Sequence, residues 1–207
     1  DDVTDNTHSI ESINELRKKL DLLISNDVAE DYIFRTLKDV KDRFYGVNYD
    51  FKPFYDMLLG HEMDLNNTKY NTLDELLVYC RYVASSVGEM LIPILTTSDD
   101  KKLYDVAHDL GIAMQLTNIL RDVGEDFLNN RLYLPKEIME KFGLTTLMIE
   151  SRVVTKEFIN VFEYISSIAF DYYDKAYKNL IYFPKSSRIP LTYALVIYRE
   201  ILVVSKE

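Results

Sequence analysis

The chain has 207 residues, of which 47% are hydrophobic and 13% aromatic, enough apolar material for a globular core and too much for a disordered chain. The net charge of −10 argues against nucleic-acid binding, since that function needs a basic face to neutralise phosphates. The single cysteine, Cys80, excludes an internal disulfide and is typical of a reducing cytoplasm, and no apolar run reaches the length of a membrane-spanning helix.

The first part of the chain predicts one helix after another. Asp1 to Asp5 (DDVTD) is an acidic cluster whose first and last carboxylates are one helical turn apart. Apolar residues recur at spacings of three and four residues over 9–25, which predicts a helix there. A second helix is predicted over 28–46, with Gly46 as its C-terminal stop. Pro53 marks the start of a third helix.

The middle of the chain predicts two longer helices. Thr72 starts a segment that runs to residue 95, in which Pro93 is expected to kink or break the helix. Ser98 to Asp100 form a turn and an N-cap, and the helix that follows contains residues 115–126.

The last third also reads as helical. A short amphipathic helix is predicted over 136–143 and a long aromatic-rich helix over 154–180. Pro184 and Pro190 are expected to bracket a loop before a final helix over 190–204. No strand-like alternation persists anywhere, so the predicted fold class is all-α.

One polar stripe stands out on the helix over 115–126. Gln115, Asn118, Asp122 and Asp126 share a helical face, with Arg121 just outside it. Carboxylates four residues apart repel one another, so the pair costs stability unless a positive charge lies between them. Amide and carboxylate oxygens are ligands suited to a hard cation.

The cluster Asp1 to Asp5 is a second acidic helical turn, far away in sequence but similar in build. If the two acidic turns faced each other across a cavity, they would hold several Mg²⁺ ions, which bridge carboxylates to phosphates. Such a site serves the ionisation of a diphosphate leaving group, because the ions neutralise the charge that grows on the departing oxygens.

The segment 79–88 contains small residues in mid-helix. Gly88 costs about 1 kcal/mol relative to alanine at such a position. Ala84 and Val87 accompany it, and Tyr79 lies at one end of the same segment. Together these residues form either a tight helix–helix contact or the smooth wall of a groove for a long apolar chain. The residues alone leave both interpretations open.

Three passages resemble, in order and spacing, the head-to-head prenyl synthases, a family that comprises squalene, phytoene and dehydrosqualene synthases. They are DDVTD (1–5), YCRYVASSVGEML (79–91) and QLTNILRDVGEDFLNNRLYLP (115–135). Within the family the chain looks most similar to the bacterial dehydrosqualene (4,4'-diapophytoene) synthases, and phytoene synthase is the near alternative. One departure is Ser85, which stands where many relatives have glycine.

The resemblance implies an isoprenoid-synthase-type helical bundle around a central cavity. Residues 1–207 are expected to form a single prenyl synthase domain that lacks part of its N- and C-terminal ends. The implied reaction condenses two farnesyl diphosphates through presqualene diphosphate to dehydrosqualene, with Mg²⁺ and without NADPH. Phytoene synthase would use two geranylgeranyl diphosphates instead, and squalene synthase proper would need NADPH, for which the sequence shows no binding signature.

The resemblance also implies roles for individual residues. The implied metal ligands are Asp1, Asp5, Asn118, Asp122 and Asp126, with Asp2 beside the first motif. The implied catalytic residues are Asp1, Asp5, Asp122, Asp126 and Tyr79, the last as a cavity tyrosine near the reacting carbons. The implied substrate-binding residues are Gln115, Arg121, Tyr198, Ala84, Val87 and Gly88.

The expected partners are isoprenyl diphosphates and not nucleic acids. Because substrate and product are lipids, we expect transient contact with a membrane surface and a cytoplasmic, peripheral location. The competing hypothesis from another class is a non-catalytic helical module that binds a partner. An Asp122→Ala change would separate the two, since it leaves such a module unaffected.

Overall fold

The computed structural model describes residues 10–46, 48–98 and 100–205, and each regular element within these ranges is helical. In chain order the elements are α2 (Ile10–Asn26), α3 (Tyr32–Phe44), α4 (Lys52–Leu65), α5 (Leu73–Cys80), the π-helical turn η1 (Arg81–Ser85), α6 (Ser86–Leu95), α7 (Lys101–Leu128), α8 (Lys136–Phe142), α9 (Thr146–Glu150), α10 (Lys156–Asn179), the 3-10 turn η2 (Leu180–Tyr182) and α11 (Lys185–Val204). The all-α prediction is confirmed.

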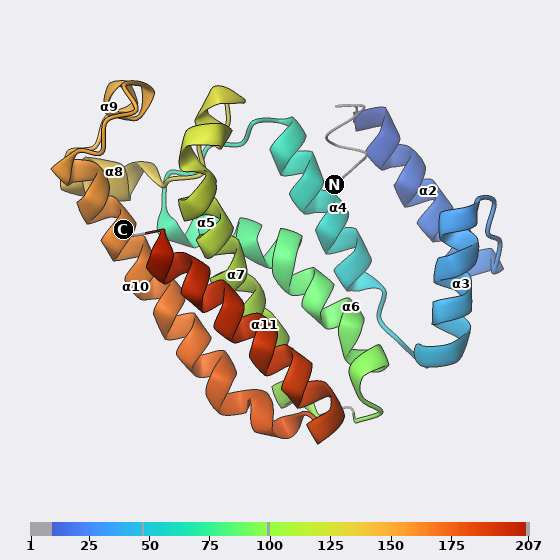
Figure 1. Ribbon diagram of the computed structural model, residues 1–207. Helices are drawn as coiled ribbons and strands as arrows, with labels where there is room; N and C mark the ends of the chain where they lie inside the picture. Colours follow the sequence, from blue (N-terminus) through green and yellow to red (C-terminus); the bar gives the residue numbers. More distant parts are fainter. Residues whose placement is uncertain (1–9, 47, 99, 206–207) are drawn as a thin grey trace.

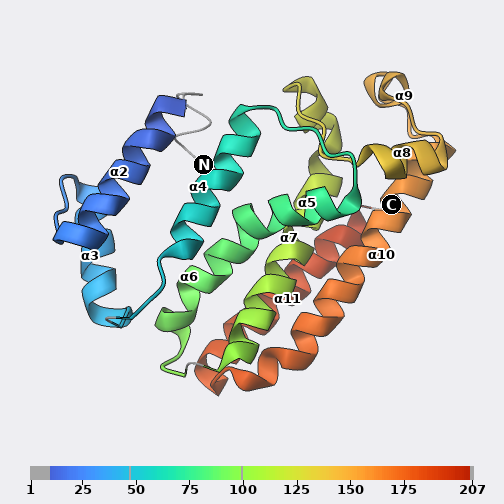
Figure 2. The ribbon, with the colours of Figure 1, turned by 180° about the vertical axis from the view of Figure 1, so that it is seen from behind.

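Helix α7 is the element around which the larger hydrophobic core is built. It packs against α10, α6, η1 and α11, and Figures 1 and 2 show it between α6 on one side and the α10–α11 pair on the other. A smaller apolar cluster joins α2 and α3 to α4, at the opposite side of the molecule from α8 and α9. No helix among the described residues is both long and apolar enough to cross a lipid bilayer.

The predicted helix starts at Thr72 and Asp100 are confirmed by their capping hydrogen bonds. The Thr72 hydroxyl accepts from the backbone N–H of Glu75 at 3.2 Å, and the Glu75 carboxylate accepts from the N–H of Thr72, which completes a capping box. The Asp100 carboxylate accepts from the N–H of Lys102 at 3.0 Å and starts α7. Both caps satisfy backbone donors that a helix start leaves unpaired.

The segment from Leu73 to Leu95 is interrupted at a different place from the one predicted. The π turn η1 divides it, and the backbone N–H of Ser86 bonds the carbonyl of Arg81, five residues back. Pro93 lies in the last turn of α6 and does not break the helix, which ends two residues later. At the π turn the backbone comes so close to α7 that a Cβ on Gly111 would lie 2.5 Å from the nitrogen of Ser85.

Two other predicted segments differ from the structure. The helix predicted over 28–46 is α3, which begins at Tyr32 and ends at Phe44, so Gly46 follows its C-cap as predicted but without the left-handed conformation that Gly143 adopts after α8, with φ of 72°. The expected loop between Pro184 and Pro190 is instead the first part of α11. Proline removes only one backbone bond there, and the buried Ser187 hydroxyl ties this turn to α6 by donating to the Leu95 carbonyl.

Candidate functional site

The polar stripe of α7 is present as predicted, but part of its charge is compensated from within the helix. The Arg121 guanidinium donates two hydrogen bonds to Asp122, from Nε at 2.7 Å and from Nη2 at 2.6 Å. These bonds raise the pKa of Arg121, and the Tyr198 hydroxyl on α11 adds to the shift. The structure therefore pairs Arg121 with Asp122, and Tyr198 lies on α11, which packs against α7, with its ring partly buried against the larger core.

Among the described residues Asp126 has no such hydrogen-bond partner, so it is the carboxylate of the stripe whose charge is least compensated. Burial raises its pKa to about 6, the nearby charge of Asp122 adds to this rise, and Arg131 opposes it. A carboxylate whose ionised form is disfavoured gains the most from an added cation. Asp126 is thus the residue of the stripe that a divalent ion would stabilise most strongly.

Asn118 supplies an independent indication that the stripe is a ligand site. Its Oδ1 is buried and has no hydrogen-bond partner among the described residues, although a buried amide oxygen is normally satisfied. It lies one helical turn before Asp122, so an amide oxygen and two carboxylates occur on successive turns. Oxygen ligands of these kinds fit a magnesium ion.

The described part of α7 provides only half of the predicted metal site. Asp1, Asp2 and Asp5 lie outside the residues that the structure describes. Within the described ranges no cluster of three or more histidine, cysteine, aspartate or glutamate side chains could hold a metal ion. The residues of α7 fit Mg²⁺ as a partial ligand set that needs oxygens from a second element.

A tyrosine–carboxylate cluster next to the stripe was missed by the sequence analysis. The Tyr79 hydroxyl donates to Asp64 Oδ2 at 3.1 Å, and the Tyr133 hydroxyl donates to Asp64 Oδ1 at 2.8 Å. The Tyr79 and Tyr133 rings stack with centroids 5.2 Å apart, and the Tyr70 ring lies 5.4 Å from that of Tyr79. The cluster joins α4, α5 and the segment that follows α7.

Burial controls the protonation of this cluster. It raises the pKa of Asp64, while the hydroxyl bonds from Tyr133 and Tyr79 and the charge of Arg131 oppose the rise. Burial also raises the pKa of Tyr79 and of Tyr133, and the charge of Asp64 adds to both shifts, so both hydroxyls keep their protons at neutral pH. The sequence signals were weak: Tyr133 lies within RLYLP, and Asp64 is an acid between two apolar residues.

The predicted small-residue wall divides between two roles. A Cβ on Gly88 would lie 3.0 Å from Ala107 Cβ, so Gly88 faces α7 at a tight helix contact and not a groove. Ala84 and Val87 lie on another face of the same segment, which continues to Leu91 at helical spacing. Val87 and Leu91 are 40% and 43% exposed, and Ala84 is partly buried. Val87 and Leu91 leave a partly exposed apolar stripe on α6, whereas the backbone of Ala84 lies against Gly111 of α7.

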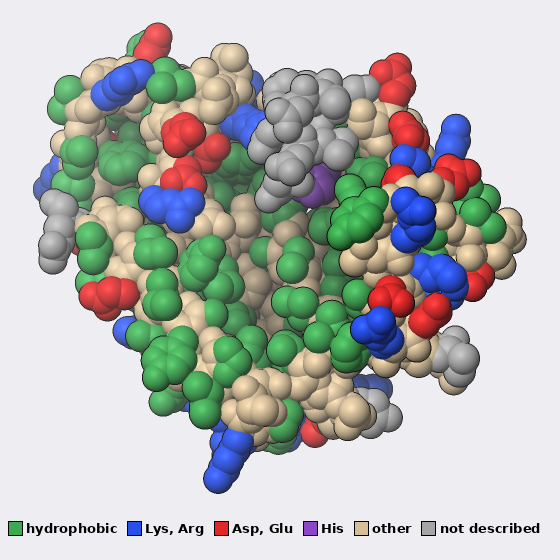
Figure 3. All heavy atoms as spheres, turned by 45° about the vertical axis from the view of Figure 1, so that its right-hand side comes forward, with side chains coloured by type: hydrophobic (Ala, Val, Ile, Leu, Met, Phe, Trp, Pro, Cys, Tyr) green, Lys and Arg blue, Asp and Glu red, His purple; other side chains and the backbone are tan. Residues whose placement is uncertain are grey.

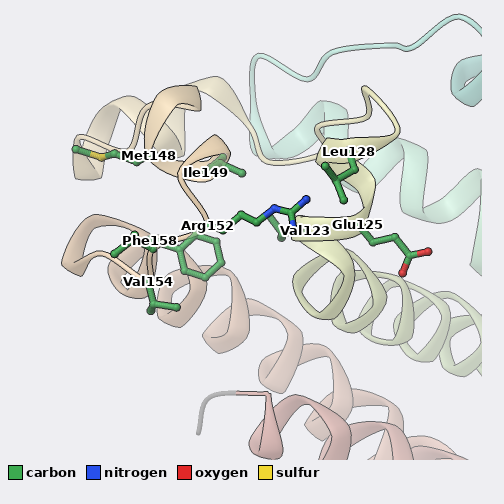
Figure 4. Close-up of a pocket in the computed structure, with 10 residues that line it drawn as sticks. Val123, Glu125, Leu128, Met148, Ile149, Arg152, Val154 and Phe158 are labelled. Atoms are coloured by element: carbon green, nitrogen blue, oxygen red, sulfur yellow. The ribbon is translucent and has the colours of Figure 1, made fainter.

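The surface of the molecule is hollowed on the face that Figure 3 shows, and hydrophobic side chains surround this hollow. A separate cavity of about 400 Å³ lies between α7, α9 and α10, where Arg152 is placed among apolar side chains (Figure 4). A third space of about 710 Å³ borders Tyr70, Phe127 and Arg131. Neither of the two cavities is lined by Ala84 or Val87.

The helical arrangement defines the class of protein, which is the isoprenoid-synthase type of helical bundle. It matches the crystal structure of a dehydrosqualene synthase in complex with ligand with a TM-score of 0.89 at 36% identity, covering 97% of this chain and 69% of that chain. The structure of squalene synthase HpnC from Alicyclobacillus acidocaldarius has a TM-score of 0.86 over 94% of this chain and 72% of that chain, and at 22% identity it supports the fold alone.

Sequence comparison adds the family. The squalene/phytoene synthase family matches residues 1–204, and the chain belongs to this family. Phytoene synthase 2, chloroplastic, of Solanum lycopersicum is 39% identical over 86% of this chain and 58% of its own length. Phytoene synthase 1, chloroplastic, of Zea mays is 38% identical over 83% of this chain and 42% of its own length, so the chain spans about half of these relatives.

Proposed function

We propose that the full-length protein is a prenyltransferase that condenses two allylic diphosphates head to head and releases diphosphate. The observation that carries the proposal is the stripe of α7, where the unpartnered oxygen of Asn118 and the destabilised carboxylate of Asp126 flank Asp122. Membership in the squalene/phytoene synthase family supports the same class of reaction. Ligand oxygens without a compensating charge suit a site that is completed by metal and diphosphate together.

The cofactor of this proposal is Mg²⁺, held by Asn118, Asp122 and Asp126 together with Asp1 and Asp5 of the first acidic motif. Bound magnesium would neutralise the charge that develops on the departing diphosphate oxygens. Arg121 is exposed at the edge of the stripe and carries donors suited to a diphosphate. Gln115, one turn before Asn118, is a further polar contact for the same group.

The proposed reaction balances without a reductant. The C–O bond of one farnesyl diphosphate breaks, and the double bond of the other captures the allylic cation and then loses a proton, which leaves presqualene diphosphate. That intermediate loses its own diphosphate, rearranges and releases a second proton to give dehydrosqualene. The 36% identity to a dehydrosqualene synthase supports the fifteen-carbon substrate. Identities of 38–39% to plant phytoene synthases support geranylgeranyl diphosphate as the alternative.

One product analysis tests the proposal. Full-length protein with Mg²⁺ and farnesyl diphosphate is expected to give a thirty-carbon triene, detected by mass spectrometry, together with released diphosphate. A forty-carbon product formed faster from geranylgeranyl diphosphate would overturn the substrate assignment. Absence of product from both substrates would overturn the enzymatic proposal itself, and reactions with a chelator in place of Mg²⁺ are the control.

We expect Val87→Phe to lower turnover without destabilising the protein. Val87 is 40% exposed on the apolar stripe of α6, so a phenyl ring there obstructs a prenyl chain but displaces no core side chain. The expected change in unfolding free energy is within about 0.5 kcal/mol. Steady-state kinetics and thermal unfolding measure the two effects.

The matched control for that variant is Val28→Phe, because Val28 has a similar exposure of 44% and lies between α2 and α3. It is expected to keep wild-type turnover. Unchanged rate and product length in Val87→Phe would remove the stripe from the proposed channel wall.

A further inference from the structure

We infer that Asp64 is a positioning residue that holds the Tyr79 and Tyr133 hydroxyls with their protons directed away from the reacting carbons. The inference rests on the proposed function and extends it to a carboxylate outside both acidic motifs. Asp64 lies on α4, and its two carboxylate oxygens each accept one tyrosine hydroxyl, at 3.1 Å and 2.8 Å. Each carboxylate oxygen of Asp64 therefore accepts a hydrogen bond from a different one of the two stacked tyrosines.

The direction of these hydrogen bonds has a chemical consequence. A tyrosine hydroxyl has one proton, and a carboxylate can only accept, so Asp64 accepts the one hydrogen bond that Tyr79 can donate and the one that Tyr133 can donate. Each phenolic oxygen is left with lone pairs for any other neighbour. A carbocation close to this cluster meets the negative end of the hydroxyl dipole, which stabilises positive charge.

The arrangement also keeps the carboxylate itself from reacting. Both oxygens of Asp64 are covered by hydroxyls, so the negative charge acts on the site through the tyrosines and without forming an ester with the cation. Arg131 is the cation whose charge acts on Asp64 most directly, and it belongs to the segment that carries Tyr133. The stacked rings of Tyr70, Tyr79 and Tyr133 hold the hydroxyls at a constant separation.

A purely structural role for Asp64 makes a different prediction. The three aromatic rings contact one another independently of the carboxylate, and Tyr79 is only 2% exposed within the larger core. If Asp64 only held α4 against α5, its loss would lower the stability of the protein. The measured turnover would then fall only because less of the protein is folded. If it orients the hydroxyls, its loss lowers turnover in protein that is fully folded.

The test uses Asp64→Asn in the full-length protein with Mg²⁺ and the diphosphate that proves to be the substrate. Asparagine keeps the shape but offers one acceptor and one donor group, so one tyrosine hydroxyl must reverse its direction. We expect kcat to fall about 10-fold to 100-fold, the loss typical of a residue that orients another group of a site. KM should remain within about 2-fold, since the hydrogen bonds that the structure gives Asp64 go to the two tyrosine hydroxyls and not to the stripe of α7.

A double-mutant cycle with Tyr79→Phe distinguishes the two roles. If Asp64 acts through Tyr79, the double variant loses little more turnover than either single variant, whereas independent effects would multiply. The control is Tyr173→Phe, which deletes a buried hydroxyl that bonds Thr117 at 2.8 Å outside the cluster, and it should retain wild-type kcat. Circular dichroism of each variant measures the folded fraction.

The outcomes separate the inference from the proposed function. If the wild type is active and Asp64→Asn is no slower than Tyr173→Phe, the inference is overturned and the proposed function stands. Multiplicative losses of kcat in the double-mutant cycle have the same meaning. If Asp64→Asn does not fold, full kcat in both Tyr79→Phe and Tyr133→Phe overturns it as well. A wild type that forms no product from either diphosphate overturns the proposed function and the inference with it.

Discussion

Replacing Asp126 with asparagine is expected to stabilise the folded protein at pH 7 and to abolish the synthase activity proposed for the full-length protein. The pKa of Asp126 is raised from 3.8 to about 6 in the fold, so its ionised form is less favourable there than in the unfolded chain. The folded state then loses stability as the pH rises from about 4 to about 6 and regains none above. The asparagine side chain does not ionise, so the variant does not lose this stability.

The expected gain in unfolding free energy is about 1 kcal/mol at pH 7, after allowance for solvent screening of a partly exposed group. It should disappear as the pH falls well below 3.8, where the carboxyl is protonated in both states. Thermal unfolding of protein without divalent ions measures this dependence. Activity should fall at least about 100-fold because the variant lacks one of the proposed metal ligands.

Asp122→Asn is the matched comparison, since it removes the neighbouring carboxylate of the same stripe. Asp122 is held by two hydrogen bonds from Arg121, so its loss leaves that guanidinium unpaired and brings no gain in stability. Activity is expected to fall as for Asp126→Asn. Equal stability of both variants would contradict the assignment of the electrostatic cost to Asp126, and full activity of both would contradict the metal site.

The second large effect is expected for Gly111→Ala, which should destabilise the protein by about 3 kcal/mol. Its Cβ would lie 2.5 Å from the nitrogen and 2.6 Å from the Cα of Ser85, and these are backbone atoms of the π turn that cannot rotate away. Relief requires α7 to move away from the turn η1. Such a loss lowers the melting temperature of a protein of this size by roughly 10 °C.

Gly124→Ala in the same helix is the control for that substitution. No other described residue lies within 4 Å of the Cβ position of Gly124, so only the helix propensity of alanine acts there, and it stabilises by about 1 kcal/mol. Thermal unfolding of both variants should therefore show opposite signs. A Gly111→Ala variant as stable as Gly124→Ala would show that α7 and η1 are not held in this close contact.

Much of the fold follows from local patterns in the sequence. Apolar residues at spacings of three and four predicted the helices, and the side chains of Thr72 and Asp100 predicted where two of them begin. Such signals succeed because capping and amphipathic periodicity involve residues only a few positions apart. Proline was the less reliable signal: Pro93 and Pro190 both lie within helices, because each removes one backbone bond near a helix end and packing outweighs that loss.

The stripe of α7 was likewise determined by the sequence itself. Residues 118, 122 and 126 share a face in any α-helix, so their mutual approach required no knowledge of the rest of the molecule. Their different electrostatic states could not be predicted. Arg121 donates to Asp122, whereas Asp126 is partly buried and has no such partner in the described part of the chain. Side-chain orientation and burial depend on the surrounding helices.

Only the tertiary structure decided how distant residues combine. Asp64 and Tyr133 are 69 positions apart, and no local pattern brings a carboxylate of α4 to two tyrosines from other segments. The same holds for Gly88 and Gly111, whose close contacts depend on how α6, η1 and α7 pack. Local hydrogen bonding therefore determined the helices and the acidic stripe, while long-range packing determined the tyrosine cluster, the charge balance and the tight helix contacts.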